Sequence, residues 1–250
     1  AYGAEYIVSP QLLALYDIVG FDPRGVGRSA PIRCLTDDEA DENYASDPKP
    51  DNPQEFDAMV KETQDYVEKC EKNTKNLSAY GTENTARDMD VIRAVLGDKK
   101  LNYLGKSYGT YLGTIYAQLF PDKVGRVVLD GAIDPGATPL EQSLIQAVGF
   151  DNALDAFIKD CLQLDTCPLP KDATKQYFTD LFDSVAKKPL TTSTKRVATE
   201  SLVVLGTASA LYDSESGWPM LHPLLALGRA RSRVRVRARG NPSSDTNNVV

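Results

Sequence analysis

The pentapeptide Gly105-Lys106-Ser107-Tyr108-Gly109 places a serine between two apolar runs of different periodicity. Residues 101–104 form a strand-like run, whereas residues 108–120 carry apolar side chains at three- and four-residue spacing. This change of period predicts a strand, a tight turn and an amphipathic helix. A serine on such a turn needs small residues two positions to either side, and Gly105 and Gly109 meet that need. Ser107 is therefore the candidate nucleophile.

A serine nucleophile also needs a base, because its hydroxyl reacts weakly at neutral pH until a group, usually a histidine oriented by a carboxylate, takes its proton. The chain has one histidine, His222, beside Pro223. We interpret it as incidental. Asp130, at the end of an apolar run, is a candidate for the triad acid.

Short apolar runs alternate with helical patterns along the first half of the chain. Strands are predicted at 16–21, 101–106 and 126–130, and helices at 56–70 and 84–96, with a solvated, acidic excursion at 36–55. This alternation predicts an α/β fold with a mostly parallel sheet and flanking helices. Residues 1–139 form the predicted core, residues 140–228 a strand-free helical cap subdomain, and residues 229–250 a tail.

The predicted tail differs in charge from the rest of the chain. It holds six arginines and one acid, so it carries +5, whereas the first 228 residues carry −12 within a net charge of −7. Three interpretations stay open for this tail: disorder, an arm for anionic surfaces, and a shifted reading frame. The acidic body argues against nucleic acid as a partner. No run reaches the ~18 apolar residues of a membrane span.

The four cysteines fall into two sequence-local pairs, Cys34 with Cys70 and Cys161 with Cys167. None forms a CxxC motif, and a single histidine would leave a zinc site all-cysteine, so we predict two disulfides and neither metal nor cofactor. Disulfides would place the protein outside the cytosol, secreted or in the cell envelope. Four buried free thiols in a cytosolic protein are the alternative.

Three motifs together resemble one protein family. YDIVGFDPRGVGRS, YLGKSYGTYLGTIYAQLFPD and VLDGAIDP are similar to the secreted tripeptidyl aminopeptidases of actinobacteria, in the prolyl-aminopeptidase-like group of the α/β-hydrolase fold. The resemblance implies that Ser107 attacks a peptide or ester carbonyl and that the backbone N–H of Tyr108 forms half of the oxyanion hole. Within the first motif, the chemistry of the residues themselves favours structural roles for Asp22, as a turn cap, and for Arg24, as an ion-pair partner near the strand ends.

The same resemblance implies that several functional parts are absent from this chain. The family's glycine-rich loop with the second oxyanion donor would precede it, and the strands with the acid and the histidine would follow it. We therefore expect a partial α/β-hydrolase fold with unpaired strand edges and little or no activity. An esterase or acyltransferase of the same fold, and a non-catalytic degenerate hydrolase, are the two rival hypotheses.

Overall fold

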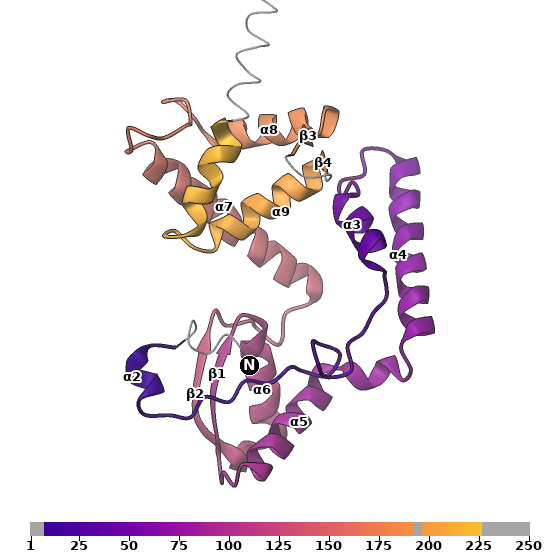
Figure 1. Cartoon of the computed structure of the whole chain (residues 1–250), viewed down its shortest axis with the longest axis vertical. Helices are drawn as coiled ribbons and strands as arrows, with labels where there is room; N and C mark the ends of the chain where they lie inside the picture. The colour runs from indigo at the N-terminus through magenta and orange to yellow at the C-terminus, as the bar shows by residue number, and fades with distance from the viewer. Residues whose placement is uncertain (1–7, 193–196, 227–250) are drawn as a thin grey trace, which may run out of the picture. The chain divides into compact units, whose positions relative to one another are not determined.

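The computed structural model describes residues 8–192 and 197–226. These residues divide into two compact units, one made of residues up to 39 with 51–142, the other of 40–50 with those from 143 onward. We call them the sheet unit and the helical unit and describe each by itself (Figure 1). The arginine-rich tail predicted at 229–250 lies outside the described residues.

The sheet unit is built on two parallel strands. β1 (Leu101–Lys106) pairs with β2 (Val124–Asp130), with Gly105 opposite Leu129 and Lys106 opposite Asp130. Between them the chain crosses over through α6 (Tyr108–Leu119) and the short 3-10 helix η2 (Pro121–Lys123), as parallel pairing requires. The predicted strand, turn and helix around Ser107 are confirmed.

Helix α5 (Thr82–Val95) completes this layer by packing on α6, which in turn covers one face of the two strands. A small apolar core joins the two helices, with Ala86 and Met89 from α5 against Leu112 and Tyr116 from α6. The same helices share a polar contact, because the Tyr116 hydroxyl donates to Asp90 at 3.0 Å. Helix packing thus fixes the position of α6, and with it the turn that precedes α6.

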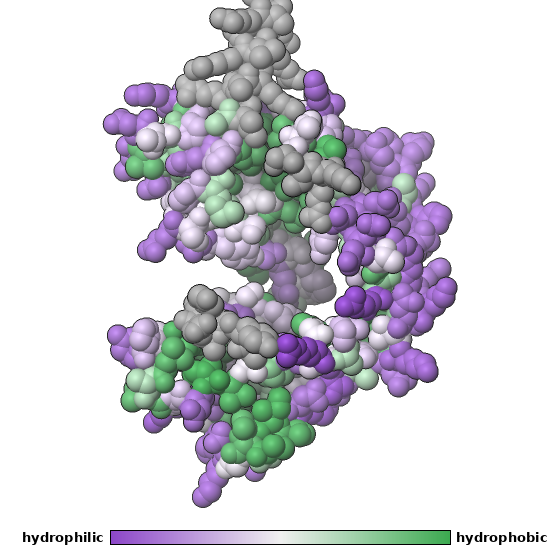
Figure 2. Space-filling view, viewed as in Figure 1, coloured by the Kyte–Doolittle hydropathy of each residue, from purple (hydrophilic) through white to green (hydrophobic). Residues whose placement is uncertain are grey.

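The strand predicted at 16–21 is wrong as a strand. These residues follow the short helix α2 (Pro10–Leu13) as extended chain that pairs with no strand among the described residues, although the Arg126 guanidinium donates to the Tyr16 hydroxyl at 3.0 Å. Val19 is 55% exposed, and Ile18 is also exposed. A strand exists only through its ladder, so an apolar run alone does not make one. Apolar side chains accordingly gather on the surface of this unit in the space-filling view (Figure 2).

The acidic segment also differs from its prediction, since part of it forms α3 (Asp37–Ala45). A capping box begins this helix: the Thr36 N–H donates to the Glu39 carboxylate at 2.8 Å, and the Glu39 N–H donates to the Thr36 hydroxyl at 3.3 Å. Helix α4 (Pro53–Asn73) extends the predicted helix at both ends. It is capped by Asn52, whose side chain accepts from the Glu55 N–H at 3.0 Å.

Glu39 provides a test of these contacts. Its carboxylate accepts from Lys69 at 2.7 Å, and this bond, with the two from Thr36, lowers its pKa from 4.5 to about 2. Since the folded pKa is the lower one, the contribution to stability is complete above pH 4.5 and is lost as the pH falls towards 2. We expect an NMR-detected titration of Glu39 to have its midpoint near 2.

Lys69→Gln should raise the Glu39 pKa by at least about one unit, because it removes the strongest partner. Lys61→Gln is the matched control: it removes the same charge from the same helix, where Lys61 pairs with Asp65 instead. An unshifted Glu39 pKa in Lys69→Gln would contradict the assignment.

The helical unit has its own core. It contains α7 (Pro139–Cys161, whose first turn is counted with the sheet unit), α8 (Lys175–Lys187), α9 (Glu200–Leu211) and helical residues 217–226. Each of these segments contributes to the apolar core: α9 adds Val203, Ala210 and Leu211, and the other three segments supply its fully buried side chains. Two short strands, β3 (Leu190–Thr191) and β4 (Val197–Ala198), pair antiparallel in this unit. The prediction that no strands follow Pro139 is therefore wrong for these four residues.

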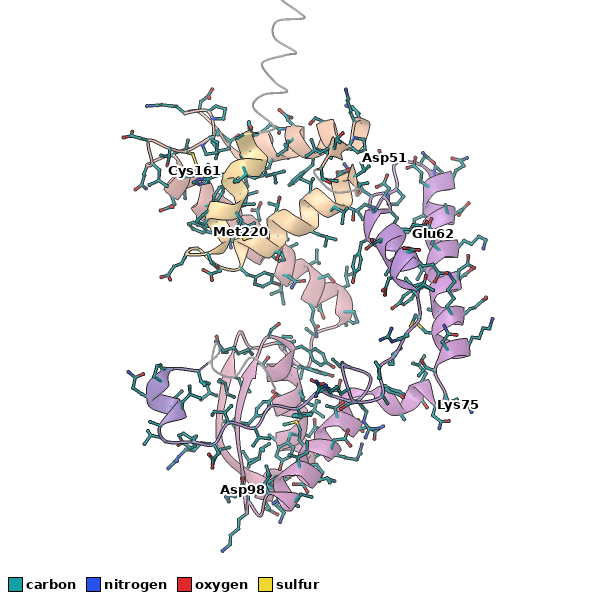
Figure 3. The ribbon with its side chains drawn as sticks, viewed as in Figure 1. Asp51, Glu62, Lys75, Asp98, Cys161 and Met220 are labelled. Atoms are coloured by element: carbon teal, nitrogen blue, oxygen red, sulfur yellow. A yellow bond between two sulfur atoms is a disulfide. The ribbon has the colours of Figure 1, made fainter. Side chains whose placement is uncertain are left out.

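Both predicted disulfides are confirmed, and the free-thiol alternative is wrong. Cys34 bonds to Cys70 in the sheet unit, and Cys161 bonds to Cys167 in the helical unit, at the end of α7 (Figure 3). Within the described ranges, no helix is long and apolar enough to cross a membrane.

Candidate active site

Ser107 occupies the turn between β1 and α6 with a backbone conformation that few serines adopt. Its φ is 52° and its ψ is −122°, and its side chain is exposed. A non-glycine residue held at positive φ costs about 1–3 kcal/mol, so the surrounding structure must enforce it. Such strain on an exposed serine, between a strand and a helix, is the geometry of a nucleophile elbow.

Gly105 and Gly109 allow the backbones of β1 and α6 to approach closely at the Ser107 turn. A Cβ on Gly105 would lie 2.5 Å from the carbonyl oxygen of Gly109, and one on Gly109 would lie 3.2 Å from the Tyr103 hydroxyl. That hydroxyl donates to the same Gly109 carbonyl at 2.8 Å. Burial raises the pKa of Tyr103, which keeps the phenol protonated as a donor. The need for small residues at these positions, inferred from the sequence, thus has a steric cause.

Backbone and side-chain hydrogen bonds tie the elbow to the end of β2. The Ser107 N–H donates to the Asp130 carbonyl at 2.9 Å. The hydroxyl of Thr110, which is fully buried, donates to the Ser107 carbonyl at 2.7 Å and accepts from the Ile133 N–H at 2.9 Å. Sequence reasoning missed Thr110, although a polar residue on the apolar face of α6 was a detectable signal.

Thr110→Val is expected to lower the free energy of unfolding by about 1–3 kcal/mol, because it leaves the Ile133 N–H without its acceptor. Chemical denaturation measures this loss. Thr110→Ser is the matched control: it keeps the hydroxyl, so it should lose only the energy of one buried methyl, about 1 kcal/mol. Equal losses in the two variants would show that the hydroxyl does not hold the elbow.

Tyr108, the first residue of α6, presents both its N–H and its side chain at the elbow. Its ring is 56% exposed and lies 5.7 Å from that of Tyr111. Its hydroxyl hydrogen-bonds that of Thr82, the first residue of α5. The N–H stands at a helix N-terminus, where developing negative charge is stabilised. Its role as an oxyanion donor, like that of Ser107 as nucleophile, stays a prediction.

The loop at 22–29 makes structural contacts through Asp22 and Arg24, as predicted. The Asp22 carboxylate accepts from the Arg28 N–H at 3.0 Å. Arg24 forms a two-pronged pair with Asp88 on α5, at 2.8 and 2.6 Å, and donates to the Ala79 carbonyl at 2.7 Å. The pKa of Arg24 is raised by this pairing. These contacts anchor the loop to the helix that packs on α6.

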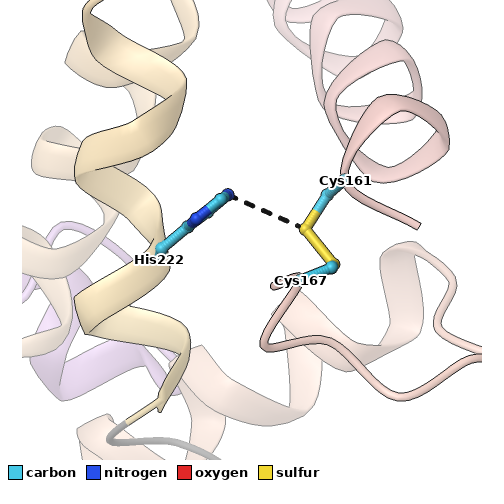
Figure 4. Close-up of a disulfide and its surroundings, with 3 residues drawn as sticks. All are labelled: Cys161, Cys167 and His222. Carbon is cyan, nitrogen blue, oxygen red and sulfur yellow. Dashed lines mark hydrogen bonds between the residues drawn. A yellow bond between two sulfur atoms is a disulfide. The ribbon is translucent and has the colours of Figure 1, made fainter. Parts of the chain in front are cut away.

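A general base and an acid that would activate Ser107 are not seen beside it in the described part of the sheet unit. The Asp130 carboxylate lies 3.5 Å from the Lys106 ammonium, and its backbone carbonyl holds the Ser107 N–H. The only histidine of the sequence lies in the helical unit, with its Nε2 3.9 Å from the Sγ of Cys161 (Figure 4). The sheet unit therefore contains the predicted nucleophile and one predicted oxyanion donor, and no histidine.

No group of three or more His, Cys, Asp or Glu side chains in the described part of the chain could hold a metal ion. The chemistry available at the elbow is that of an exposed serine hydroxyl at a helix N-terminus, an arrangement that suits acyl transfer once a base is supplied.

Comparison with known proteins gives this geometry a context. The family described as alpha/beta hydrolase fold matches residues 3–212. The chain is 40% identical over 209 residues to serine protease Hip1 of Mycobacterium tuberculosis, covering 79% of the chain and 40% of that protein.

Two further relatives cover different shares of the chain. It is 49% identical over 139 residues to a tripeptidyl aminopeptidase of Streptomyces lividans, covering 54% of the chain and 26% of that protein. It is 39% identical over 234 residues to carboxylesterase B of Mycobacterium tuberculosis, covering 90% of the chain and 44% of that protein. The chain thus spans less than half the length of these relatives.

Proposed function

Since the chain belongs to the family with the alpha/beta hydrolase fold, we propose that it is a serine hydrolase of the aminopeptidase type, with Ser107 as its nucleophile. The observation that carries the proposal is the strained, exposed conformation of Ser107 between β1 and α6. The fold alone would not suffice, because one fold serves many functions. The elbow supplies the site-specific argument.

The proposed reaction is acyl transfer in two steps. The Ser107 Oγ attacks the carbonyl carbon of a peptide bond, the C–N bond breaks, and the amine leaves with a proton while the acyl group stays on the serine. Water then cleaves the ester and regenerates the hydroxyl. The Tyr108 N–H, at the start of α6, would stabilise the negative charge on the carbonyl oxygen in both steps.

A peptide substrate is favoured by the names of two relatives, a serine protease and a tripeptidyl aminopeptidase. The second candidate is an esterase or acyltransferase, which is favoured by the relative named carboxylesterase B, since it matches 90% of this chain. The elbow itself does not choose between the two, because amide and ester carbonyls are attacked in the same way.

We further propose that this chain turns substrate over slowly. The sheet unit contains no histidine, and His222 of the helical unit contacts a disulfide sulfur. Without a general base the serine hydroxyl keeps its proton, and the remaining acceleration comes from binding and from the oxyanion donor. Two disulfides support a secreted or cell-envelope location for it.

Parallel assays with a p-nitrophenyl acyl ester and a tripeptidyl p-nitroanilide test the proposal. We expect slow, Ser107-dependent release of nitrophenol without an early burst, because acylation itself lacks a general base, and Ser107-dependent release of nitroaniline at a lower rate. Ser107→Ala should lose both signals. Ester cleavage with no anilide cleavage would favour the esterase, and identical traces for the wild type and Ser107→Ala would favour the non-catalytic hypothesis.

A further inference from the structure

The disulfide between Cys161 and Cys167 has two unequal ends. Cys161 closes α7 and is 1% exposed, within the apolar core of the helical unit. Cys167 lies in the following loop and is only partly buried. A thiol arriving from solvent therefore reaches the sulfur of Cys167 more easily than that of Cys161. Attack on one sulfur of a disulfide makes the other the leaving group.

An imidazole stands beside the leaving sulfur. The Nε2 of His222 is 3.9 Å from the Sγ of Cys161, although the two residues are 61 positions apart in the sequence. The histidine ring also lies against Phe157, one turn before Cys161 on α7, with 6.3 Å between ring centroids. An imidazole N–H next to a departing thiolate stabilises its charge and lowers the barrier to its departure.

The second disulfide is a control built into the same chain. Cys34 and Cys70 are both buried, at 8% and 7% exposure, so neither sulfur is the easier target. No histidine is available to them, because the sequence has only His222 and it contacts Cys161. Their sequence separation is 36 residues against six for the other pair, so the Cys34–Cys70 bond closes a far longer loop.

We propose that Cys161–Cys167 is a thiol–disulfide exchange site that takes up a low-molecular-weight thiol on Cys167, with His222 as the positioned acid for Cys161. The thiolate of the small molecule attacks the Sγ of Cys167, the bond between the two cysteine sulfurs breaks, and Cys161 leaves as a thiolate. The proton lost by the small thiol returns to Cys161 through the imidazole. The products are a mixed disulfide on Cys167 and a free thiol on Cys161, and the reverse attack restores the starting bond.

Reaction of the full chain with reduced glutathione, quenched with iodoacetamide and mapped by mass spectrometry, tests the proposal. We expect glutathione on Cys167 and the alkyl group on Cys161. This reaction should proceed at least about tenfold faster than opening of Cys34–Cys70 in the same sample. Glutathione on Cys161, or equal rates for the two disulfides, would overturn the proposal.

Two variants separate the role of the imidazole from that of packing. His222→Gln should slow the opening of Cys161–Cys167 about tenfold. Trp218→Phe is the matched control, because Trp218 also packs on Phe157, with 5.7 Å between ring centroids, and should leave the rate unchanged. The Cys34–Cys70 rate in each sample reports any general loosening. A His222→Gln rate equal to that of the wild type would contradict the proposed role of the histidine as an acid. If this variant unfolds, the positions of the two adducts in the wild type decide whether the proposal stands.

Discussion

Gly105→Ala is expected to lower the free energy of unfolding by about 3 kcal/mol and to slow acylation of Ser107 at least tenfold. The added Cβ would lie 2.5 Å from the Gly109 carbonyl oxygen and 2.7 Å from a ring carbon of Tyr103. Backbone cannot yield as a flexible side chain can, so α6 would have to move away from β1, and overpacking of this kind costs about 1–3 kcal/mol or more. Urea denaturation followed by circular dichroism gives the stability.

The functional part of the effect follows from the same displacement. The Tyr108 N–H belongs to the first turn of α6, so a shifted helix carries this proposed oxyanion donor away from the Ser107 Oγ. Gly81→Ala is the matched control, because Gly81 has an ordinary φ of −72° and no atom lies within 4 Å of its added Cβ. Wild-type stability in Gly105→Ala would show that the close approach of strand and helix is not required.

Removal of the Cys34–Cys70 disulfide by the double change to serine is expected to cost about 4 kcal/mol. The bond closes a loop of 36 residues in sequence separation, and the chain-entropy treatment assigns about that value to a loop of this length. Because whole domains are stable by only about 5–15 kcal/mol, this would be a large fraction of the total.

The double change to serine at Cys161 and Cys167 is the comparison. Their separation is six residues, and the same treatment gives about 2 kcal/mol. Urea denaturation of the two variants at equal protein concentration shows which disulfide contributes more to the free energy of unfolding. A larger loss from the short loop than from the long one would contradict the entropic argument and indicate that packing around Cys161 dominates.

The elbow could be predicted from sequence because its determinants are local. The change of apolar period at Ser107 and the two glycines beside it lie within a few residues of the turn that they form. The anchors of the elbow were not predictable in the same way. Thr110 bonds to Ile133, and Tyr108 bonds to Thr82, 26 residues away, so both contacts depend on how strands and helices pack.

The extended segment at 16–21 shows that an apolar run alone does not predict a strand. Its composition is that of a buried strand, but strand formation needs a neighbour with which to share hydrogen bonds, and composition does not identify that neighbour. The capping box of α3 was present in the sequence as Thr36 and Glu39. It was overlooked because the segment 36–55 is acidic and contains several prolines, which suggested a solvated loop. The contact of His222 with Cys161, 61 positions away in the sequence, could not be predicted because it depends on tertiary structure.

Labelling with a fluorophosphonate probe, mapped to a single peptide by mass spectrometry, tests the nucleophile assignment most directly. The account predicts modification of Ser107 in the folded chain, more slowly than in a serine hydrolase with a complete triad, and none in Ser107→Ala or in urea. Equal labelling of the wild type and Ser107→Ala would contradict it.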